Sequence, residues 1–421
     1  MSFCPVELKE GVRLTHVVTE RGKSDSFCVA FRIPFSKENL SKVALISKVL
    51  IRGTKNFPDT MSICRECEDN YGCSIDIYYK HTGNELTLVF QLSYLRKRYT
   101  FDNNDTAVRA FDLLKDFIFL PYLVDGAFDI SYVEREKQAL CERIASIFNN
   151  KPAYAVRRAD MIMREGEPNA VTIYDCEQVI RECSAKDLTA FFEECVANCP
   201  VDMIYAGIQP VSEIISLIDS RLHFDPRRFS LPGPVVKRAT DHIKEIVEEA
   251  EATQSTLVMG FRITADLCAD DYPQLNLFSA ILSLSPVSKL FMNVREKQSL
   301  CYYCNAHINS SDGIMMVSAG IDDENYEKTK TAILQQIEDI KNGVITEDEL
   351  QNAIRSNYSA YKSSADQSSY LCSFYLNHII NGRFFTPEEE CEFSLNVTAN
   401  DAVTIAKTIV PDTFYLLKGT V

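Results

Sequence analysis

Two pairs of cysteines have the spacing of metal ligands. Cys64 and Cys67, and again Cys301 and Cys304, are separated by two residues, and four thiolates in two such pairs can hold Zn²⁺. Cys64 and Cys67 lie in a predicted helix, however, where cysteines three residues apart more often pack as small apolar side chains. Cys304 also occupies the position in the second half of the chain that Cys73 occupies in the first, so Cys301 and Cys304 need not lie near Cys64 and Cys67. We therefore expect no metal at these cysteines.

The histidines and serines provide no other catalytic centre. The six histidines lie far apart, and none is within five residues of another: His16, His81, His223, His242, His307 and His378. A His-x-x-Glu-His zinc motif needs two histidines one helical turn apart. No serine has a Gly-x-Ser-x-Gly context, and no glycine-rich phosphate loop is present. The sequence therefore predicts no metal, no cofactor and no catalysis by the chain alone.

The composition is that of an acidic globular protein. The 421 residues are 46 % hydrophobic and 24 % charged, and the formal net charge is −15. An acidic surface repels nucleic acid, and no apolar stretch approaches the roughly 20 residues that span a bilayer. The N-terminal residues do not read as a secretory signal, and the 15 cysteines are typical of reduced thiols. We expect a cytoplasmic protein that binds neither nucleic acid nor membrane.

An internal repeat of about 230 residues organises the chain. Strands are predicted at 12–18 and 26–33 in the first half, and at 242–248 and 255–263 in the second. Each strand pair is followed by an apolar helix, a hairpin with a glycine in its loop, and two long helical segments. The helical segments are predicted at 37–52, 106–119 and 132–149 in the first half, and at 272–284, 326–341 and 347–377 in the second.

This order of elements predicts an α+β fold with two tandem pseudo-symmetric domains. Each domain is expected to have a largely antiparallel sheet with helices on one face. The predicted boundaries are 1–226 and 241–421, and the proline-containing residues 227–240 form the predicted linker. A duplication this regular suggests a clamshell whose two halves face each other across a cavity.

Four stretches of the sequence resemble the insulinase-type (M16) zinc metallopeptidases, and they occur in the order of that family. They are Leu50-Ile51-Arg52-Gly53-Thr54-Lys55, Asn70-Tyr71-Gly72-Cys73, Val133-Glu134-Arg135-Glu136-Lys137, and Ser288-Lys289-Leu290-Phe291 followed by residues 294–302. Residues 414–419 resemble a bacterial subgroup called YmfF-like. The resemblance covers nearly the whole chain and implies the M16 fold, which is also called LuxS-like.

The resemblance also implies where the zinc site of active members would lie. Alignment on the first of the four stretches places their His-x-x-Glu-His motif at Ala44, Ser47 and Lys48. Alanine has no ligand atom, serine is no carboxylate base, and lysine would bring a positive charge beside a dication. The distal glutamate ligand falls on Arg143, although a shift of one residue would make it Glu142. We hypothesise that Lys48 and Arg143 fill the vacated pocket with positive charge.

A second functional pair of the family is retained. Active relatives carry an arginine, and a tyrosine seven residues later, that bind the substrate carbonyl and stabilise the oxyanion, and Arg295 and Tyr302 have that spacing. A guanidinium and a phenol are suitable donors for developing negative charge. In the alternative interpretation, Arg295 pairs with a neighbouring carboxylate and Tyr302 packs as an aromatic residue at the start of a strand.

The resemblance therefore implies a non-catalytic subunit of a heteromeric peptidase. A zinc-bearing M16 subunit would form a heterodimer with this chain, which would supply Arg295, Tyr302 and part of the chamber wall to a peptide substrate. The alternative is a structural scaffold or peptide-binding chamber with no part in hydrolysis. The sequence leaves a homodimer of the isolated chain open.

Overall fold

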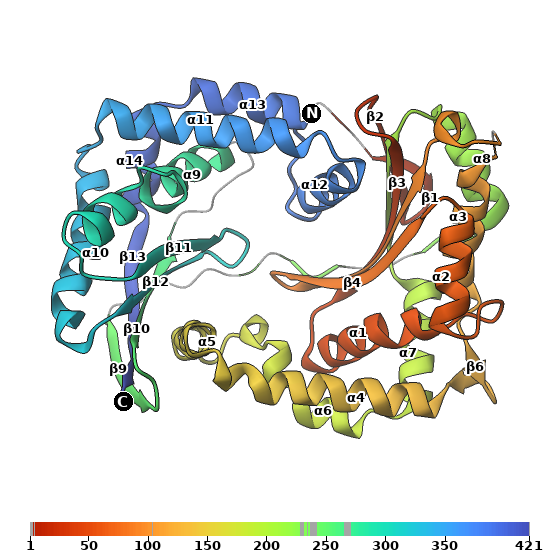
Figure 1. The fold of residues 1–421 in the computed structure, drawn as a ribbon, viewed down its shortest axis with the longest axis horizontal. Coiled ribbons are helices and arrows are strands. Elements are labelled where there is room, and N and C mark those ends of the chain that lie inside the picture. Colours follow the sequence, from red (N-terminus) through yellow and green to blue (C-terminus); the bar gives the residue numbers. More distant parts are fainter. Residues whose placement is uncertain are drawn as a thin grey trace. The chain divides into compact units, whose positions relative to one another are not determined.

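In the computed structural model the chain forms two compact units, and neither is continuous in sequence (Figure 1). The first unit comprises Met1–Ala145, Val171–Pro234 and Ser364–Phe385, and the second comprises Ser146–Ala170, Val235–Ser363 and Thr386–Val421. The structure describes residues 3, 5–102, 104–227, 231–233, 235, 242–264 and 271–420. The predicted linker, residues 227–240, therefore lies largely outside the described residues.

The first unit is built on a six-stranded sheet in the order β1-β2-β8-β3-β5-β4. Its strands are β1 (Val6–Lys9), β2 (Val12–Val18), β3 (Ser24–Pro34), β4 (Ser74–Thr82), β5 (Glu85–Leu95) and β8 (Val201–Gly207). β2 and β8 run parallel, and the other neighbours run antiparallel. β3 is buried at nine consecutive positions, which is expected of a central strand that is covered on both faces.

The second unit repeats this plan with the order β11-β12-β10-β13-β9. Its strands are β9 (Lys244–Ala250), β10 (Ser255–Ile263), β11 (Tyr303–Asn309), β12 (Ile314–Ile321) and β13 (Ile409–Gly419). Here too one hairpin forms an edge and a fully buried strand follows. The one parallel pair among the described strands of this unit, β13 and β9, lies at the other edge. The predicted fold class, with its pseudo-symmetric sheets, is confirmed.

Helices surround each sheet, and most of them pack against one face. In the first unit they are α1 (Lys37–Val49), α2 (Thr60–Asp69), α3 (Thr106–Phe119), α4 (Ile130–Ala145), α6 (Glu177–Glu182), α7 (Ala185–Asn198) and α8 (Val211–Arg221). In the second they are α9 (Tyr272–Ser279), α10 (Tyr326–Lys341), α11 (Glu347–Ser364), α13 (Pro387–Asn396) and α14 (Ala399–Lys407). A short two-stranded ribbon, β6 (Leu123–Val124) and β7 (Ala127–Phe128), precedes α4.

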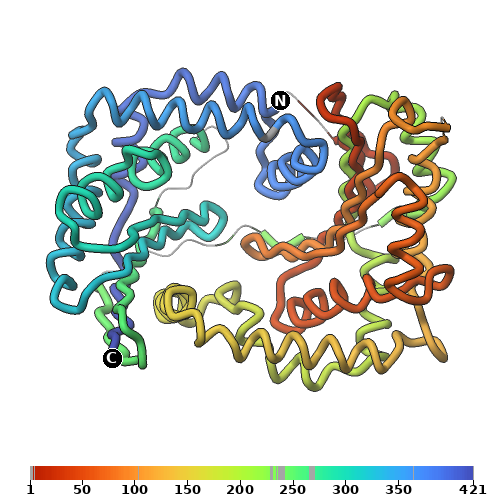
Figure 2. Tube along the Cα trace, in the orientation of Figure 1, coloured from red at the N-terminus to blue at the C-terminus, as the bar shows by residue number. Residues whose placement is uncertain are grey.

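Each sheet is also covered by one helix that comes from the other half of the sequence. Helix α5 (Lys151–Met163) packs on β10 and β13, and helix α12 (Ser368–Ile380) packs on β3 and β8. Figure 2 shows α5 in yellow beside the green and blue strands, and α12 in blue beside the red strands. Sequence analysis placed 146–170 with the first half and 364–385 with the second, so the compact units differ from the sequence repeat by this exchange.

One predicted helix is two helices in the structure. Residues 347–377 were expected to form a single helix, but α11 ends at Ser364 and α12 begins at Ser368. The break is accompanied by an ion pair between Asp366 and Arg21 (3.1 Å). The break lets α12 join the first unit while α11 stays with the second. Helical periodicity alone could not predict it, because the break is required by the packing of the two units.

Candidate functional site

Helix α1 brings three of the predicted positions together. It begins after Ser36, whose hydroxyl accepts a hydrogen bond from the Asn39 amide (3.0 Å). Residues at i, i+3 and i+4 share one helix face, so Ala44, Ser47 and Lys48 lie together near the end of the helix. Ala44 and Ser47 are buried, and Lys48 is half-buried.

Helix α4 supplies the opposite wall and settles which of its residues faces α1. Leu140, Arg143 and Ile144 line a common pocket with the three α1 residues. Glu142 is exposed, does not line this pocket, and accepts a hydrogen bond from Gln138 on its own helix (2.8 Å). The geometry therefore favours Arg143 over Glu142 as the counterpart of the distal ligand position.

A buried ion pair holds the two helical walls in register. The chain after α1 continues as a 3₁₀ turn (Leu50–Arg52), and Arg52 Nε donates to a carboxylate oxygen of Glu136 on α4 at 2.8 Å. Glu136 is only 6 % exposed. Because an unpaired buried carboxylate is costly, this contact favours the observed packing of α1 against α4.

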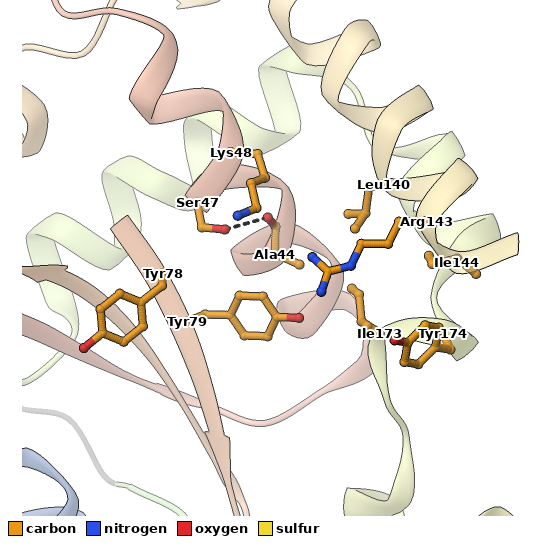
Figure 3. Close-up of a pocket in the computed structure, with 10 residues that line it drawn as sticks. All are labelled: Ala44, Ser47, Lys48, Tyr78, Tyr79, Leu140, Arg143, Ile144, Ile173 and Tyr174. Carbon is orange, nitrogen blue, oxygen red and sulfur yellow. Dashed lines mark hydrogen bonds between the residues drawn. The ribbon is translucent and has the colours of Figure 1, made fainter. Parts of the chain in front are cut away.

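The third wall comes from the edge of the sheet. β4 is the last strand of the first unit's sheet, and its Tyr78 and Tyr79 line the pocket. Successive residues of a strand point to opposite faces, and in Figure 3 the Tyr79 ring extends toward Arg143 while the Tyr78 ring points away. Consistent with this, the Tyr78 hydroxyl donates to Gln91 Oε1 on β5 at 2.9 Å.

Together these elements enclose a pocket of about 240 Å³. Ile173 and Tyr174 complete its lining, and Figure 3 shows the Lys48 ammonium, the Arg143 guanidinium and the Tyr79 hydroxyl directed into the same space. None of the described lining residues is acidic. In a chain with a net charge of −15, this is a local concentration of positive charge and of hydrogen-bond donors.

These side chains do not fit a zinc ion. Ala44 offers no ligand atom, and the Ser47 hydroxyl donates to the backbone carbonyl of Ala44 (2.8 Å). The two cations would repel Zn²⁺, whose usual ligands are thiolate, imidazole and carboxylate groups. Within the described parts of the chain, no cluster of three or more His, Cys, Asp or Glu side chains could hold a metal ion.

The Tyr79 phenol remains a neutral donor in this environment. Burial raises its pKa above the ordinary value, and the nearby positive charge of Arg143 opposes part of that shift. The phenol therefore keeps its proton at neutral pH and can donate it in a hydrogen bond.

The predicted donor pair lies in the second unit, in two adjoining segments. Arg295 belongs to a π-helical stretch (Leu290–Glu296), where it stacks on the Phe291 ring at 4.9 Å and lies 3.7 Å from Glu296. Tyr302 precedes β11, is 59 % exposed, and donates its hydroxyl proton to Asp322 at 3.1 Å. The hydrogen bond to Asp322 raises the pKa of Tyr302. Arg295 contacts Phe291 and Glu296, whereas Tyr302 contacts Asp322, so each side chain is positioned by its own surroundings.

The cysteine pairs have neighbours that the sequence did not indicate. Cys67 interacts with Cys73 rather than with Cys64, which is exposed, and the contact raises the pKa of Cys67. Cys301 and Cys304 do contact each other, and this contact lowers the pKa of Cys301. A four-cysteine zinc site would have to combine residues of both units, and the expectation that these cysteines bind no metal stays a prediction.

The tyrosines of the pocket were not predicted from the sequence. Tyr78 and Tyr79 stand in the predicted hairpin and Tyr174 follows α5, but no spacing rule links either position to residues 44–48. The available signal was that the predicted hairpin follows the predicted helix that carries Lys48. Only the pairing of β4 with β5 and the packing of α1 against them bring these rings to the cations.

Comparison with known proteins agrees with this architecture. Residues 182–357 match the family model described as the Peptidase M16 inactive domain. The chain is 28 % identical over 417 residues to a probable inactive metalloprotease, YmfF, of Bacillus subtilis (strain 168), covering 98 % of this chain and 97 % of the relative. The structure of a conserved protein from Enterococcus faecalis V583 is similar over 100 % of this chain and 99 % of its own length, with 26 % identity and a TM-score of 0.89.

The chain is similar to M16-type proteins over nearly its whole length. The M16 inactive domain structure from Pseudomonas fluorescens shares the fold, with a TM-score of 0.79 at 17 % identity over 100 % of this chain and 99 % of that chain. The matched family model and the Bacillus subtilis relative are both described as inactive. Consistent with this, the side chains of Ala44, Ser47 and Lys48, where the sequence predicts the zinc motif, can neither hold the metal nor activate water. Among the described helices of this chain, none is long and apolar enough to cross a membrane.

Proposed function

We propose that this chain is the non-catalytic subunit of a heteromeric M16 peptidase whose zinc-bearing partner carries the hydrolytic centre. The observation that carries the proposal is the contrast between its two units. The first has lost the chemistry for zinc at Ala44, Ser47 and Lys48, whereas the second presents Arg295 and Tyr302 on its surface. A chain that lacks zinc ligands but keeps the two donors can still assist catalysis that takes place on another subunit.

In this role the two side chains act as hydrogen-bond donors. The side chain of Arg295 is 42 % exposed, and its ion-pair contact with Glu296 is long, at 3.7 Å, so its N–H groups are accessible to a substrate carbonyl. Tyr302 is held by Asp322 (3.1 Å), which orients the phenol. When a peptide carbonyl becomes an oxyanion, such donors stabilise the developing charge more strongly than they stabilise the ground state. The partner's zinc would supply the activated water.

Co-expression of the chain with a zinc-bearing M16 protein from the same cells tests this proposal. We expect Arg295→Ala to lower kcat of the purified complex by about 100-fold, the scale of losing one oxyanion donor. Tyr302→Phe keeps the ring and removes the hydroxyl, so a smaller loss is expected. Arg355→Ala removes another exposed arginine of the second unit and is the matched control.

Assembly must be measured in the same samples. The complexes of wild type, Arg295→Ala and Arg355→Ala should have equal mass and equal zinc content, because Arg295 acts on substrate and not on the metal. Full turnover by an intact Arg295→Ala complex would overturn the donor role.

A second candidate function is a peptide-binding chamber without a part in hydrolysis. It is favoured by β4, which is the edge strand of its sheet among the described residues and borders the cationic pocket. An extended peptide can add to such an edge through backbone hydrogen bonds. Binding of peptides by the isolated chain, with no loss of partner turnover in Arg295→Ala, would select this function.

A further inference from the structure

The cysteine pair beside the donor residues of the second unit has the contact that a disulfide needs. Residues three positions apart in an extended strand are about 10 Å apart, but the chain bends at Tyr302 before β11 begins, so Cys301 lies against Cys304. The Cys304 thiol donates a hydrogen bond to the Cys301 sulfur. Because a disulfide requires Cβ atoms about 4 Å apart, thiols that are already in contact can join with little movement of the backbone.

The backbone around the pair is held by neighbouring segments. Ser299 has a φ of 50°, which lies in the left-handed region that is typical of turns. The Thr329 hydroxyl donates to the Leu300 carbonyl at 3.4 Å, and the Tyr302 amide donates to the Gly320 carbonyl of β12 at 2.9 Å. These contacts fix the bend and keep the two sulfurs together.

The two thiols differ in reactivity. The hydrogen bond from Cys304 lowers the pKa of Cys301, and the positive charge of Arg295 lowers it further against the opposing effect of burial. The same hydrogen bond, together with burial, raises the pKa of Cys304 well above its ordinary value. Because the thiolate is the nucleophile in cysteine chemistry, Cys301 is the thiol that reacts first with an oxidant, and Cys304 is placed to attack the product.

The pair lies just below the surface of the second unit. Cys301 is 8 % exposed and Cys304 is 5 % exposed, whereas Tyr302 between them is 59 % exposed. An oxidant as small as hydrogen peroxide can therefore reach the Cys301 sulfur at this bend. The cysteine content predicts a reducing compartment, in which disulfides are usually transient and serve catalysis or redox sensing. A disulfide at this position is thus expected to be reversible.

We propose that hydrogen peroxide links Cys301 and Cys304 in a reversible disulfide, and that this bond displaces Tyr302. The thiolate of Cys301 attacks the peroxide, the O–O bond breaks, a sulfenic acid forms and one water leaves. The sulfur of Cys304 then attacks the sulfenic acid, the S–S bond forms, the S–O bond breaks and a second water leaves. Two thiols are oxidised to one disulfide while one peroxide is reduced to two waters.

The disulfide acts on Tyr302 because this residue lies inside the ring that the bond closes. A disulfide holds its sulfurs about 2.05 Å apart, which is closer than two thiols in a hydrogen bond, so the bend at Tyr302 tightens. The phenol, which donates to Asp322 at 3.1 Å, is then drawn away from its orientation. Only this effect on a substrate donor rests on the proposed function, whereas the disulfide itself does not depend on it.

Peptide mapping of the full-length chain after treatment with hydrogen peroxide tests the site. Trypsin should release residues 298–328 as one peptide that contains Cys301 and Cys304 and no other cysteine. After the remaining thiols are alkylated, we expect this peptide to be unalkylated and lighter by two hydrogens, and dithiothreitol should reverse both changes. Cys304→Ser should stop the reaction at the sulfenic acid of Cys301, which dimedone captures, and Cys301→Ser should prevent the reaction.

Cys73→Ser is the matched control for the mapping. It removes one thiol from another contacting pair, Cys67 and Cys73, and should leave the linkage within residues 298–328 intact. Far-UV circular dichroism and thermal melts verify that each variant folds. An unlinked 298–328 peptide in the oxidised wild type, or linkage only between Cys67 and Cys73, would overturn the disulfide site.

Turnover of the complex with the zinc-bearing partner tests the displacement of Tyr302. Oxidation should lower kcat of the wild-type complex by the same factor as Tyr302→Phe, and it should have no further effect on the Tyr302→Phe complex. The Cys301→Ser complex should keep its turnover in peroxide, which controls for oxidation of the partner. Full turnover by the linked wild type would overturn the displacement. A reduced complex without turnover would instead contradict the proposed heteromeric peptidase, and the mapped disulfide would still support the site.

Discussion

Arg32 in the first unit and Arg262 in the second occupy equivalent positions, on the central strands β3 and β10 and within the same Phe-Arg-Ile sequence. Each faces an aspartate of the neighbouring strand. Arg262 Nε donates to Asp412 of β13 at 2.9 Å, whereas Arg32 lies 3.7 Å from Asp202 of β8. The duplicated sheets thus retain a buried Arg–Asp pair, but its geometry differs between the units.

The second partner of each arginine shows how the units diverged. Arg32 forms two hydrogen bonds with Glu85 of the adjacent strand β5 (2.7 and 2.8 Å). Arg262 instead donates to Glu167 at 2.7 Å, and Glu167 lies in the exchanged segment that carries α5. In the first unit the arginine secures its own sheet, whereas in the second it secures the helix that crosses over.

The exchanged segment of the second unit is anchored by a buried ionic cluster. Arg164 contacts Glu167 at 3.1 Å and Asp312 at 3.2 Å, and Asn169 donates to Asp312 at 2.9 Å. Asp160 lies 3.8 Å from Arg164, and its Oδ1 has no hydrogen-bond partner in the described structure. This anchor contains several titratable groups, so its strength depends on pH.

In the exchanged helix of the first unit the buried anchoring contacts are made by neutral groups, whereas its contacts with charged groups, Asp366 to Arg21 and Asn377 to Lys80, are exposed. The Ser368 and Ser26 hydroxyls lie 2.9 Å apart, and the Ser368 hydroxyl donates to the Ser24 carbonyl at 3.0 Å. Cys372 is fully buried, and its thiol contacts the Ile204 carbonyl at 3.6 Å. The comparison shows that the same topology can anchor an exchanged helix mainly through buried charged groups or mainly through buried neutral groups. We expect these two anchors to respond differently to mutation and to pH.

The largest expected effect is a difference in the free energy of unfolding between variants of the two arginines. Arg262→Met leaves Asp412 buried without its cation, and we expect a loss of about 3 to 5 kcal/mol in the free energy of unfolding. Arg32→Met leaves the partly buried Glu85 without its two hydrogen bonds, whereas Asp202 keeps an ion pair with Arg13 at 2.8 Å. We therefore expect a smaller loss of about 1 to 3 kcal/mol for this variant. Urea unfolding of both variants measures the difference. Equal losses would show that the two anchors do not differ in strength.

A pH-dependent effect is expected at Asp160. Burial raises the pKa of Asp160 from 3.8 to about 6. The charge of Arg164 opposes this shift, whereas the charges of Asp312 and Glu167 add to it. A raised carboxyl pKa means that the folded state binds the proton more tightly, so the ionised group destabilises the fold above about pH 6. This penalty disappears as the pH falls toward the unfolded value near 4.

Asp160→Asn removes the charge and should therefore stabilise the second unit. We expect a gain of about 2 kcal/mol at pH 7 to 8 that vanishes near pH 4. Chemical denaturation at both pH values provides the measurement. A gain that is independent of pH would assign the effect to packing rather than to ionisation.

The smallest expected effect concerns the neutral anchor. Ser368→Ala removes the hydroxyl that contacts Ser26, which is fully buried, and should cost about 1 kcal/mol. The loss should be the same at pH 5 and pH 8, because no group in this contact titrates in that range. A marked pH dependence in thermal melts of Ser368→Ala would contradict the neutral character of this anchor.

Much of the candidate site could be predicted from the sequence, because the prediction depends on which residue types stand at the zinc-motif positions. The alignment at residues 50–54 predicted that Ala44, Ser47 and Lys48 stand at one position, and helical periodicity requires their common face. The choice between Arg143 and Glu142 could not be made from sequence, because adjacent residues of a helix differ by about 100° in direction. Packing of α4 against α1 made that choice.

The sequence by itself determined the repeated order of the first strands, helix and hairpin in each half, the duplication, and which side chains stand at the predicted zinc-motif positions. These follow from local periodicity and from which atoms a side chain carries. Only the tertiary structure decided that α5 and α12 change places, and that Lys48, Arg143 and Tyr79 meet in one pocket. Such contacts join residues far apart in the chain, and they are selected by burial of apolar surface and pairing of charge over the whole fold, which no local pattern encodes.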